Sequence, residues 1–306
     1  MKEYLFARSN EVLMAKSFIL KYFLGIEVLI SNEGIFICQR KYVMDLLAET
    51  GMLDCKPADT PIVVNHGLQT LEGGEAANRE QYQKLVRKLI YLSHTRPNIA
   101  YAVGIVSRFM HQPQTQHMEA VNRILRYLKG TPGRGIVFQR NGHLDIQAYT
   151  DADWAGDRDE RKSTSGYFTF VGGNLVTWKS KKQKVVALSS AEAEFRGIAK
   201  GITEVLWIRK LLTELGFEHN SCELNCDNKA AISISENPVQ HDRTKHVEVD
   251  RHFIKEKLEN KIIHIPHVKS REQLADILTK AVGSEQFRET LCKLGVQDPT
   301  TQLGGE

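Results

Sequence analysis

The chain has 306 residues, 42% of them hydrophobic and 25% charged, with a formal net charge of +4. This balance is typical of chains that bury cores, so it excludes intrinsic disorder and collagen, and the length predicts two compact domains. No run approaches the ~18 apolar residues that a membrane span needs, so we expect no membrane partner. Five scattered cysteines, an odd number, predict reduced thiols in a cytoplasmic or nuclear protein rather than a disulfide framework.

The charge is distributed unevenly along the chain. Residues 1–144 contain 18 basic and 12 acidic side chains, whereas residues 145–306 contain 23 and 25. The first half is therefore basic and the second slightly acidic. Such an asymmetry allows a polyanionic partner on one side of the protein, although charge alone is a weak indication of nucleic-acid binding.

The first 53 residues predict a hairpin followed by a helix. Residues 21–30 and 34–41 are rich in β-branched and aromatic residues, and a turn cluster at 31–34 separates them. Residues 41–53 then have apolar residues near helical spacing, with Gly51 suited to end the helix.

A loop and then further helices follow. Residues 54–78 hold two prolines and three glycines with little periodicity, which predicts a loop or linker. Residues 79–111 predict amphipathic helices, the second of them starting at Pro97. Residues 117–130 predict one more helix, which Gly130 ends.

Beyond residue 140 the pattern changes to strands interleaved with helices. Three strands lead into a long helix over 191–215, which carries an apolar stripe on one side. The remaining elements give the order β-β-β-α-β-α-α-β-α, with strands at 144–150, 166–173, 174–181, 222–227 and 261–266, and later helices at 228–235, 247–260 and 271–282. This order predicts an α/β unit in which helices pack on a mixed sheet.

Four acids occupy useful positions in this second region. Asp151 ends the first strand, Glu194 lies in the first turns of the long helix, Asp227 ends the fourth strand, and Asp276 lies inside the last predicted helix. Strand ends and helix starts meet at one edge of such a sheet, where clustered carboxylates repel one another unless a divalent cation such as Mg²⁺ neutralises them. Two such ions are a common apparatus for hydrolysing a phosphodiester. By spacing alone, a set of solvated surface acids is the simpler alternative.

Local sequence favours the catalytic alternative. The segments YTDADWAGD, LSSAEAEFRGIAKG, NCDNKAAI and IPHVKSREQLADILTKAV, in this order over about residues 144–282, resemble the ribonuclease H domain of copia-type LTR retrotransposon Pol polyproteins. The resemblance implies a ribonuclease H-like, five-stranded mixed sheet with strand order 3-2-1-4-5 and flanking helices. It also implies that Asp151, Glu194, Asp227 and Asp276 bind metal, and that His267 is a mobile active-site histidine that helps to release product.

Glu192 competes with Glu194 for the helical position. The two lie about 200° apart around a helix, so both cannot face the metals. We prefer Glu194 because Phe195, Ile198 and Ile202 continue from it as the stripe that faces the sheet.

Residues 1–140 resemble the end of the reverse transcriptase in the same family. LKYFLGIEV matches its primer-gripping hairpin, and the following residues match its thumb and connection, which implies a smaller α+β region. We therefore expect three parts: 1–140, the ribonuclease H-like domain at 141–282, and a C-terminal tail at 283–306. The family's Tyr-x-Asp-Asp polymerase motif would precede residue 1, and the chain contains no Asp-Asp pair, so we expect no polymerase activity.

Two lesser signals concern binding. Trp178 stands in a basic run with Lys179, Lys181, Lys182 and Lys184, which suits contact with nucleic acid, although lysines also protect solvated edge strands. The cysteines at 222 and 226 do not have the spacing of a zinc finger, so a zinc site is disfavoured.

The sequence thus predicts a metal-dependent endonuclease that cleaves the RNA strand of RNA–DNA hybrids. It would use two Mg²⁺ ions, or Mn²⁺, and no small-molecule cofactor. Its partners would be the hybrid and the rest of the Pol polyprotein, in cytoplasmic element particles or in the nucleus. The competing hypothesis is a non-catalytic remnant of the element that acts at most as a nucleic-acid-binding module. A third, an integrase or other nuclease of related fold, fits the fold but not the AEAE and LAD segments.

Overall fold

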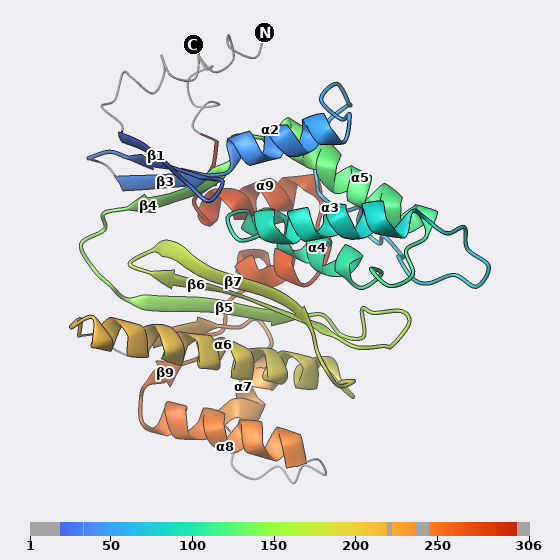
Figure 1. The fold of residues 1–306 in the computed structure, drawn as a ribbon. Helices are drawn as coiled ribbons and strands as arrows, with labels where there is room; N and C mark the ends of the chain where they lie inside the picture. Colours follow the sequence, from blue (N-terminus) through green and yellow to red (C-terminus); the bar gives the residue numbers. More distant parts are fainter. Residues whose placement is uncertain (1–18, 33, 219–221, 237–244, 299–306) are drawn as a thin grey trace. The chain divides into compact units, whose positions relative to one another are not determined.

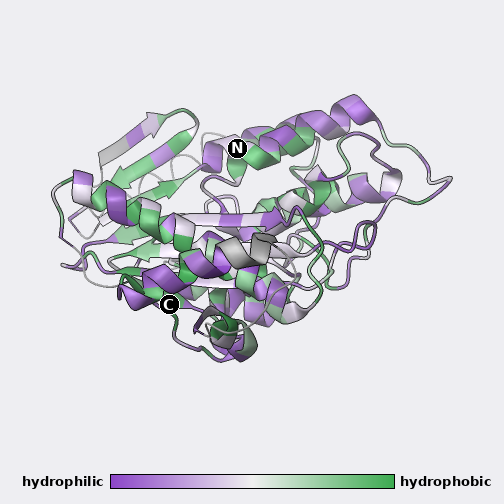
Figure 2. Cartoon of the chain, turned by 90° about the horizontal axis from the view of Figure 1, so that it is seen from below, coloured by the Kyte–Doolittle hydropathy of each residue, from purple (hydrophilic) through white to green (hydrophobic). Residues whose placement is uncertain are grey.

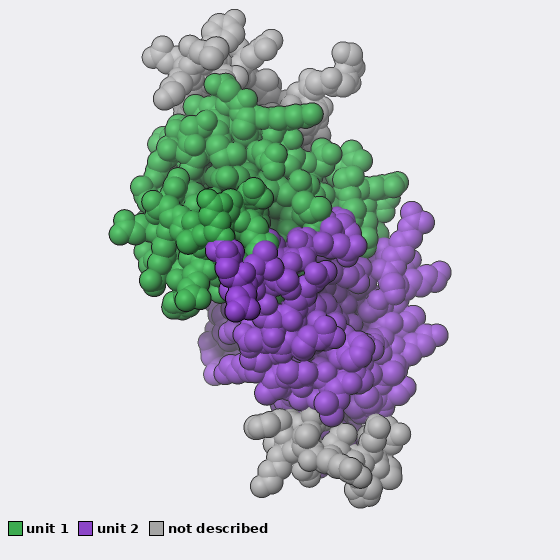
Figure 3. Space-filling model, turned by 90° about the vertical axis from the view of Figure 1, so that its right-hand side faces the viewer, with its two compact units in different colours: residues 1–63, 75–140, 283–306 green, residues 64–74, 141–282 purple. Residues whose placement is uncertain are grey.

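A computed structural model describes residues 19–32, 34–218, 222–236 and 245–298, and it divides the chain into two compact units (Figure 3). Unit 1 comprises residues 1–63, 75–140 and 283–306, and unit 2 comprises residues 64–74 and 141–282. The larger segment of unit 2 spans residues 141–282. Among the described helices, none combines the length and the apolar character needed to cross a membrane.

The C-terminal residues of the described chain differ from the expected tail. They form helix α9 (Ser284–Lys293) and strand β10 (Val296–Gln297), and both belong to unit 1. Unit 1 is therefore assembled from segments that lie before and after unit 2 in the sequence.

Unit 1 contains an antiparallel sheet with strand order β1-β2-β3-β4-β10. The expected single strand at 21–30 is wrong, because Leu24 and Gly25 both have positive φ, 48° and 76°, and form a tight two-residue turn. Strands β4 and β10 were not predicted. The first four strands are β1 (Ile19–Phe23), β2 (Ile26–Ile30), β3 (Gly34–Cys38) and β4 (Gly135–Gln139).

The helices of unit 1 before residue 140 lie close to where the sequence predicts them, whereas α9 was not predicted. The helices at 40–49, 79–92 and 115–130 each bury an apolar stripe and expose a polar one, whereas the short helix at 100–107 is apolar and exposes none of its residues. Figure 2 shows hydrophobic and hydrophilic residues on different sides of the helices. Gly51, with φ of +67°, follows the end of the first helix as expected. The elements are α2 (Arg40–Glu49), α3 (Arg79–Leu92), the 3₁₀ turn η1 (Pro97–Ile99), α4 (Ala100–Ser107) and α5 (Thr115–Gly130).

Unit 2 contains a mixed sheet with strand order β7-β6-β5-β8-β9. The first three strands of the unit form an antiparallel meander, and β8 and β9 are added parallel to β5. In chain order the sheet reads 3-2-1-4-5, which confirms the predicted ribonuclease H-like fold class. Its strands are β5 (Ile146–Ala152), β6 (Thr164–Val171), β7 (Asn174–Lys182), β8 (Cys222–Asn225) and β9 (Ile263–His264).

Helix α6 (Ser190–Glu214) covers one face of this sheet (Figure 1). Two glycines bring it close, because a Cβ at Gly201 would lie 2.9 Å from Leu224 Cδ1 and one at Gly197 would lie 3.1 Å from Thr150 Oγ1. The predicted stripe of Phe195, Ile198 and Ile202 is fully buried, whereas Leu215, at the end of the predicted helix, is 62% exposed. Helices α7 (Lys229–Glu236) and α8 (Lys245–Glu259) pack against α6.

The helix predicted at 271–282 is wrong. The chain there forms two short 3₁₀ turns, η2 (Ser270–Glu272) and η3 (Leu274–Leu278), separated by Gln273 in an extended conformation. The Gln273 side chain accepts a hydrogen bond from the backbone N–H of Ala275, which starts η3 anew and prevents one continuous α-helix. η3 lies against β5 and β6, where Gly166 leaves room for it.

The contact between β6 and η3 has no spare volume. A Cβ at Gly166 would lie 2.5 Å from Leu278 Cβ and 3.0 Å from Thr279 Cγ2. Gly166→Ala should therefore lower the free energy of unfolding by about 1–3 kcal/mol, the usual cost of overpacking. Urea unfolding monitored by circular dichroism measures this change.

Gly283→Ala is the matched control. Nothing lies within 4 Å of a Cβ at Gly283, and its φ is −64°, so no overpacking is expected. Because Gly283 is the N-cap of α9, where Ala is less favourable than Gly, we expect a loss of at most about 1 kcal/mol. Equal destabilisation by the two substitutions would contradict the close β6–η3 contact.

Candidate active site

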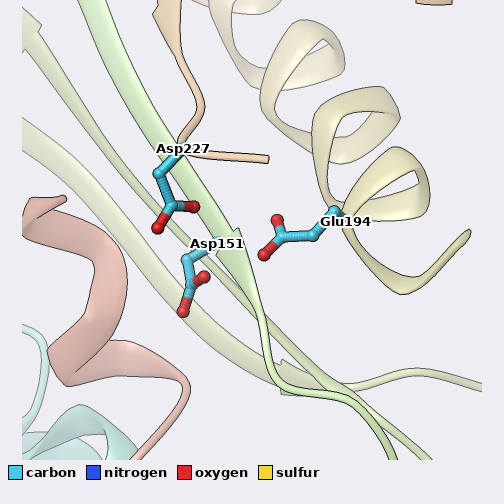
Figure 4. A group of neighbouring side chains, drawn as sticks. All are labelled: Asp151, Glu194 and Asp227. Carbon is cyan, nitrogen blue, oxygen red and sulfur yellow. The ribbon is translucent and has the colours of Figure 1, made fainter. Parts of the chain in front are cut away.

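Three carboxylates from separate elements of unit 2 converge at one end of β5 (Figure 4). One oxygen from each of Asp151, Glu194 and Asp227 lies within 4.8 Å of the others. Asp151 is near the end of β5, Glu194 is in the second turn of α6, and Asp227 directly follows Cys226 at the end of β8. Asp151 and Glu194 are only 3% and 5% exposed. The sheet and α6 thus bring together three of the four acids that the sequence predicts.

Glu194, and not Glu192, faces the other two acids. Glu192 instead stabilises the start of α6: its carboxylate accepts from the backbone N–H of Leu188 at 2.7 Å and pairs with Arg196 at 2.7 Å. Ser189 Oγ accepts in turn from the backbone N–H of Glu192, so Ser189 is the N-cap of α6 while Glu192 binds the residue that precedes it. The choice of Glu194, made from the apolar stripe of the helix, agrees with the helix face that lies towards Asp151.

Two neighbours fix the position of Asp151. The hydroxyl of Thr279 donates a hydrogen bond to Asp151 Oδ2. The buried amide of Gln273 donates to the backbone carbonyl of Thr150 at 3.0 Å. The 3₁₀ segment therefore holds the end of β5 from the side of the sheet opposite to α6.

Asp276 lies close by but outside the group of three. It is 3% exposed and pairs with Lys280 Nζ at 2.9 Å. Burial raises the pKa of Asp276, and the charge of Asp151 raises it further, so the two carboxyl groups are near enough to interact. Asp276, the fourth predicted acid, thus lies at the same end of the sheet and forms an ion pair with Lys280.

The cluster carries more negative charge than its surroundings balance. Burial raises the pKa of Glu194 well above its usual range, with Asp151 and Asp227 adding to the effect. Although burial opposes a charge on Lys280, Asp151 and Asp276 raise its pKa, so it remains a cation. Within the described residues, Glu194 Oε2 is buried and has no hydrogen-bond partner. A set of hard oxygen donors with one unpartnered member fits a divalent cation such as Mg²⁺.

His267 lies beside this group without entering it. The backbone of His267 pairs with that of Cys226, the residue before Asp227, and the His267 side chain is exposed. Its predicted role in product release stays a prediction.

The predicted basic run is divided by the pleat of β7. Successive side chains of a strand point to opposite faces, so Trp178, which pairs with Phe168, faces away from Lys179 and Lys181. Lys182 pairs with Asp157 and Glu160, both at 2.8 Å. Trp178 therefore does not form one surface on β7 with Lys179 and Lys181. The predicted contact of these residues with nucleic acid stays a prediction.

Sequence reasoning missed three residues that shape the site. Gln273 and Thr279 hold Asp151, and Lys280 neutralises Asp276. A usable signal exists for one of them, because Asp276 and Lys280 are four residues apart, a common spacing for an ion pair. No comparable pattern marks Gln273 or Thr279, whose contacts depend on the tertiary packing of η3.

The strand order and the buried acids define a ribonuclease H-like α/β unit. No protein-family model matches the chain. The chain is 43% identical over 278 residues to the retrovirus-related Pol polyprotein from transposon RE1 of Arabidopsis thaliana. The aligned region covers 90% of this chain and 19% of that protein. It is 39% identical over 271 residues to the corresponding polyprotein from transposon TNT 1-94 of Nicotiana tabacum, covering 86% of this chain and 20% of that protein.

The chain therefore belongs to the family of retrovirus-related Pol polyproteins from copia-type transposons, and it spans about a fifth of the length of these relatives. Similar solved structures include a ribonuclease H1 isolated from compost, with 16% identity, a TM-score of 0.33, and coverage of 48% of this chain and 99% of that one. Another is a foamy viral protease-reverse transcriptase in complex with an RNA/DNA hybrid, with 11% identity, a TM-score of 0.45, and coverage of 82% and 29%. With TM-scores this low, the assignment of the fold rests on the strand order itself.

The raised pKa of Glu194 predicts how stability depends on pH in the metal-free protein. A carboxyl group whose pKa is higher in the folded state stabilises fully below its unfolded value, near 4.5, and this stabilisation is lost as the pH rises through the folded pKa. The melting temperature should therefore fall between about pH 5 and pH 10. Glu194→Gln is neutral at every pH and should flatten this decline in thermal melts recorded in EDTA.

Glu192→Gln provides the comparison, because Glu192 is paired with Arg196 and lies away from the other acids. It should lower the melting temperature at every pH but keep the slope of the parent. A parent-like slope in Glu194→Gln would contradict the proposed repulsion.

Proposed function

We propose that this chain is a divalent-cation-dependent endonuclease that cleaves the RNA strand of RNA–DNA hybrids during reverse transcription. The observation that carries the proposal is the group of Asp151, Glu194 and Asp227, which converge on a sheet of ribonuclease H-like order, the first two of them buried. Membership of the Pol polyprotein family supports it. The partners would be the hybrid and the remainder of the polyprotein, in cytoplasmic element particles or in the nucleus.

Asp151, Glu194 and Asp227 would hold the cation, Mg²⁺ or Mn²⁺, and Asp276 would complete the set for a second ion. When bound, such ions activate water and stabilise the oxygen that leaves the phosphodiester. Thr279 keeps Asp151 in a fixed orientation, so the ligand is in place before the ion arrives. Glu194 would release its proton on binding, because the cation provides the positive charge that the buried cluster lacks.

Substrate recognition would depend on shape and not on base sequence. Hybrid duplexes display 2′-hydroxyl groups across a wide, shallow minor groove, and proteins recognise this feature together with the phosphates. His267 is exposed beside Asp227, a position that suits a role in product release. We expect no polymerase activity from these 306 residues, which contain no Asp-Asp pair.

One observation favours a second candidate, a non-catalytic remnant that only binds nucleic acid. Asp276 pairs with Lys280 and lies outside the group of three acids, so the fourth ligand is occupied by an internal cation. In the catalytic hypothesis this pair opens when an ion binds. A cleavage assay therefore separates the two candidates directly.

Removing the charge of one central acid should abolish cleavage. Asp227→Asn keeps the size of the side chain but removes its charge, and we expect the cleavage rate of a labelled hybrid to fall by at least ~10³, or roughly 4 kcal/mol of transition-state stabilisation. Glu194→Gln should have a similar effect. Hybrid binding in Ca²⁺ should change much less, since phosphate contacts supply most of that affinity.

Glu192→Gln is the matched control, because it makes the same chemical change two residues away. It should cleave within about threefold of the parent rate once its lower stability is allowed for. The assignment is overturned if Asp227→Asn cleaves at the parent rate, or if Glu192→Gln alone abolishes cleavage. A parent protein with no cleavage at all would favour the non-catalytic remnant.

The metal requirement gives a separate test. Mg²⁺ and Mn²⁺ at millimolar concentration should support cleavage, because both accept compact octahedral oxygen geometry. Ca²⁺ should bind without supporting it, since its longer bonds and higher coordination number position the reactants loosely. Rates measured after EDTA treatment and re-addition of each ion test this, and activity that survives EDTA would refute it.

A further inference from the structure

A second charged feature of unit 2 lies between the edge of the sheet and α6. Strands β6 and β7 form one wall of a groove of about 480 Å³, and α6 and α8 form the other. Its basic lining consists of Lys179, Lys181, Lys182, Lys184, Arg196 and Lys200. We infer that this groove binds the phosphodiester backbone of a single nucleic-acid strand.

Four of the six cations are available to a ligand. Lys182 is neutralised by Asp157 and Glu160, and Arg196 pairs with Glu192. Within the part of the chain that the structure describes, the remaining four, Lys179, Lys181, Lys184 and Lys200, form no ion pair.

The groove also has two acidic lining residues, which only partly offset these charges. Glu204 accepts a hydrogen bond from the Tyr167 hydroxyl at 2.8 Å, and Asp250 lies on α8. The surplus of positive charge remains on the side of β7, where Lys179, Lys181 and Lys184 are all exposed.

Lys200 shows the effect of this crowding. It is half-buried, and its ammonium group donates to Ser165 Oγ at 3.2 Å. Burial, together with the charges of Lys181 and Arg196, lowers the pKa of Lys200 to about 8, although Asp250 opposes the change. An anion in the groove would relieve this repulsion, so the ligand that the site favours is negatively charged.

The spacing of the cations matches a chain of phosphates better than a single ion. Lys179 and Lys181 are two residues apart on one face of β7, about 6.6 Å along the strand, and Lys200 faces them from α6. The volume is that of a small-ligand site and is too small for a duplex. Tyr167 and Phe253 also line the groove, and aromatic rings beside basic residues are typical of single-strand binding.

The groove adjoins the group of three acids through α6. Glu194 and Lys200 are six residues apart, about 9 Å along the helix axis. If the chain cleaves hybrids as proposed, the groove would hold a single-stranded extension of the substrate. The binding itself does not depend on the proposed cleavage, so the two are tested apart.

The experiment measures binding without divalent cations. Fluorescein-labelled twelve-nucleotide oligo(dT) is titrated with the full chain in EDTA, and anisotropy is followed at several salt concentrations. Lys181→Met with Lys200→Met removes two charges but keeps the apolar stems. We expect affinity at least ~10-fold weaker, and a salt-dependence slope smaller by about 1.4, the value for two lost single-strand phosphate contacts.

Two controls are matched to this variant. Lys210→Met removes a charge from the same helix at a side chain that is 78% exposed, and it should bind within about twofold of the parent. Lys181→Arg with Lys200→Arg keeps both charges and should retain most of the affinity. Thermal melts establish that each variant is folded.

Competitors identify the ligand chemistry. Unlabelled oligonucleotide should displace the probe, while inorganic phosphate, thymidine monophosphate and poly-glutamate should displace it poorly at equal charge concentration.

The inference is overturned if the double Met variant binds like the parent or if Lys210→Met weakens binding equally. It is also overturned if free phosphate competes as well as the strand, or if poly-glutamate does, which would indicate an acidic peptide as the ligand. If the chain fails to cleave hybrids but shows the expected binding, the result contradicts the proposed function and leaves the binding inference intact.

Discussion

The arrangement of unit 2 depends on one unfavourable interaction, the convergence of three carboxylates within 4.8 Å of one another, two of which are buried. Like charges at this separation and depth repel strongly, and a folded protein tolerates them only with protonation or compensating cations. Both responses are present: Glu194 has a raised pKa, and Lys280 stays charged beside Asp276. The rest of the unit supplies the packing energy that holds this cluster together.

That packing comes from rigid elements and not from loops. Gly197 and Gly201 let α6 approach β5 and β8, while Gly166 lets η3 approach from the other face. Asp151 is thus held between α6 and η3, and both elements approach the sheet closely because glycines stand at the points of contact. Sites built on such a framework keep their ligands in position before anything binds, at the expense of stability in the empty state. Destabilisation of this kind is expected of a functional site and would be unusual in a purely structural one.

Much of this could be predicted from the sequence, and the failures have physical causes. The order of strands and helices and the apolar stripe of α6 depend on local periodicity, so a mixed α/β sheet and the orientation of Glu194 follow from them, whereas the strand order within the sheet was implied by the resemblance to the copia-type family. Strand β4 has five residues and pairs with β10 about 160 positions later, so no local pattern marks it. The η2 and η3 turns replace an α-helix because the Gln273 side chain bonds to a nearby backbone group, a tertiary arrangement that overrides propensity. By contrast, the placement of Trp178 and Lys179 on opposite faces follows from the pleat of a strand alone, so it could have been predicted from the sequence.

The pairing of β4 with β10 has a consequence for synthesis on the ribosome. Ile136 and Gly135 pair with Val296 and Gln297, so one edge of the unit 1 sheet stays open until almost the whole described chain has been translated. The main segment of unit 2, residues 141–282, emerges during that interval, so unit 2 can fold before its neighbour is complete, since domains generally fold as units in the order of synthesis. An open strand edge is a template for pairing with other chains. The nascent protein therefore passes through a stage in which a finished nuclease-like unit is tethered to an unfinished sheet, and chaperone protection would be most valuable at that stage.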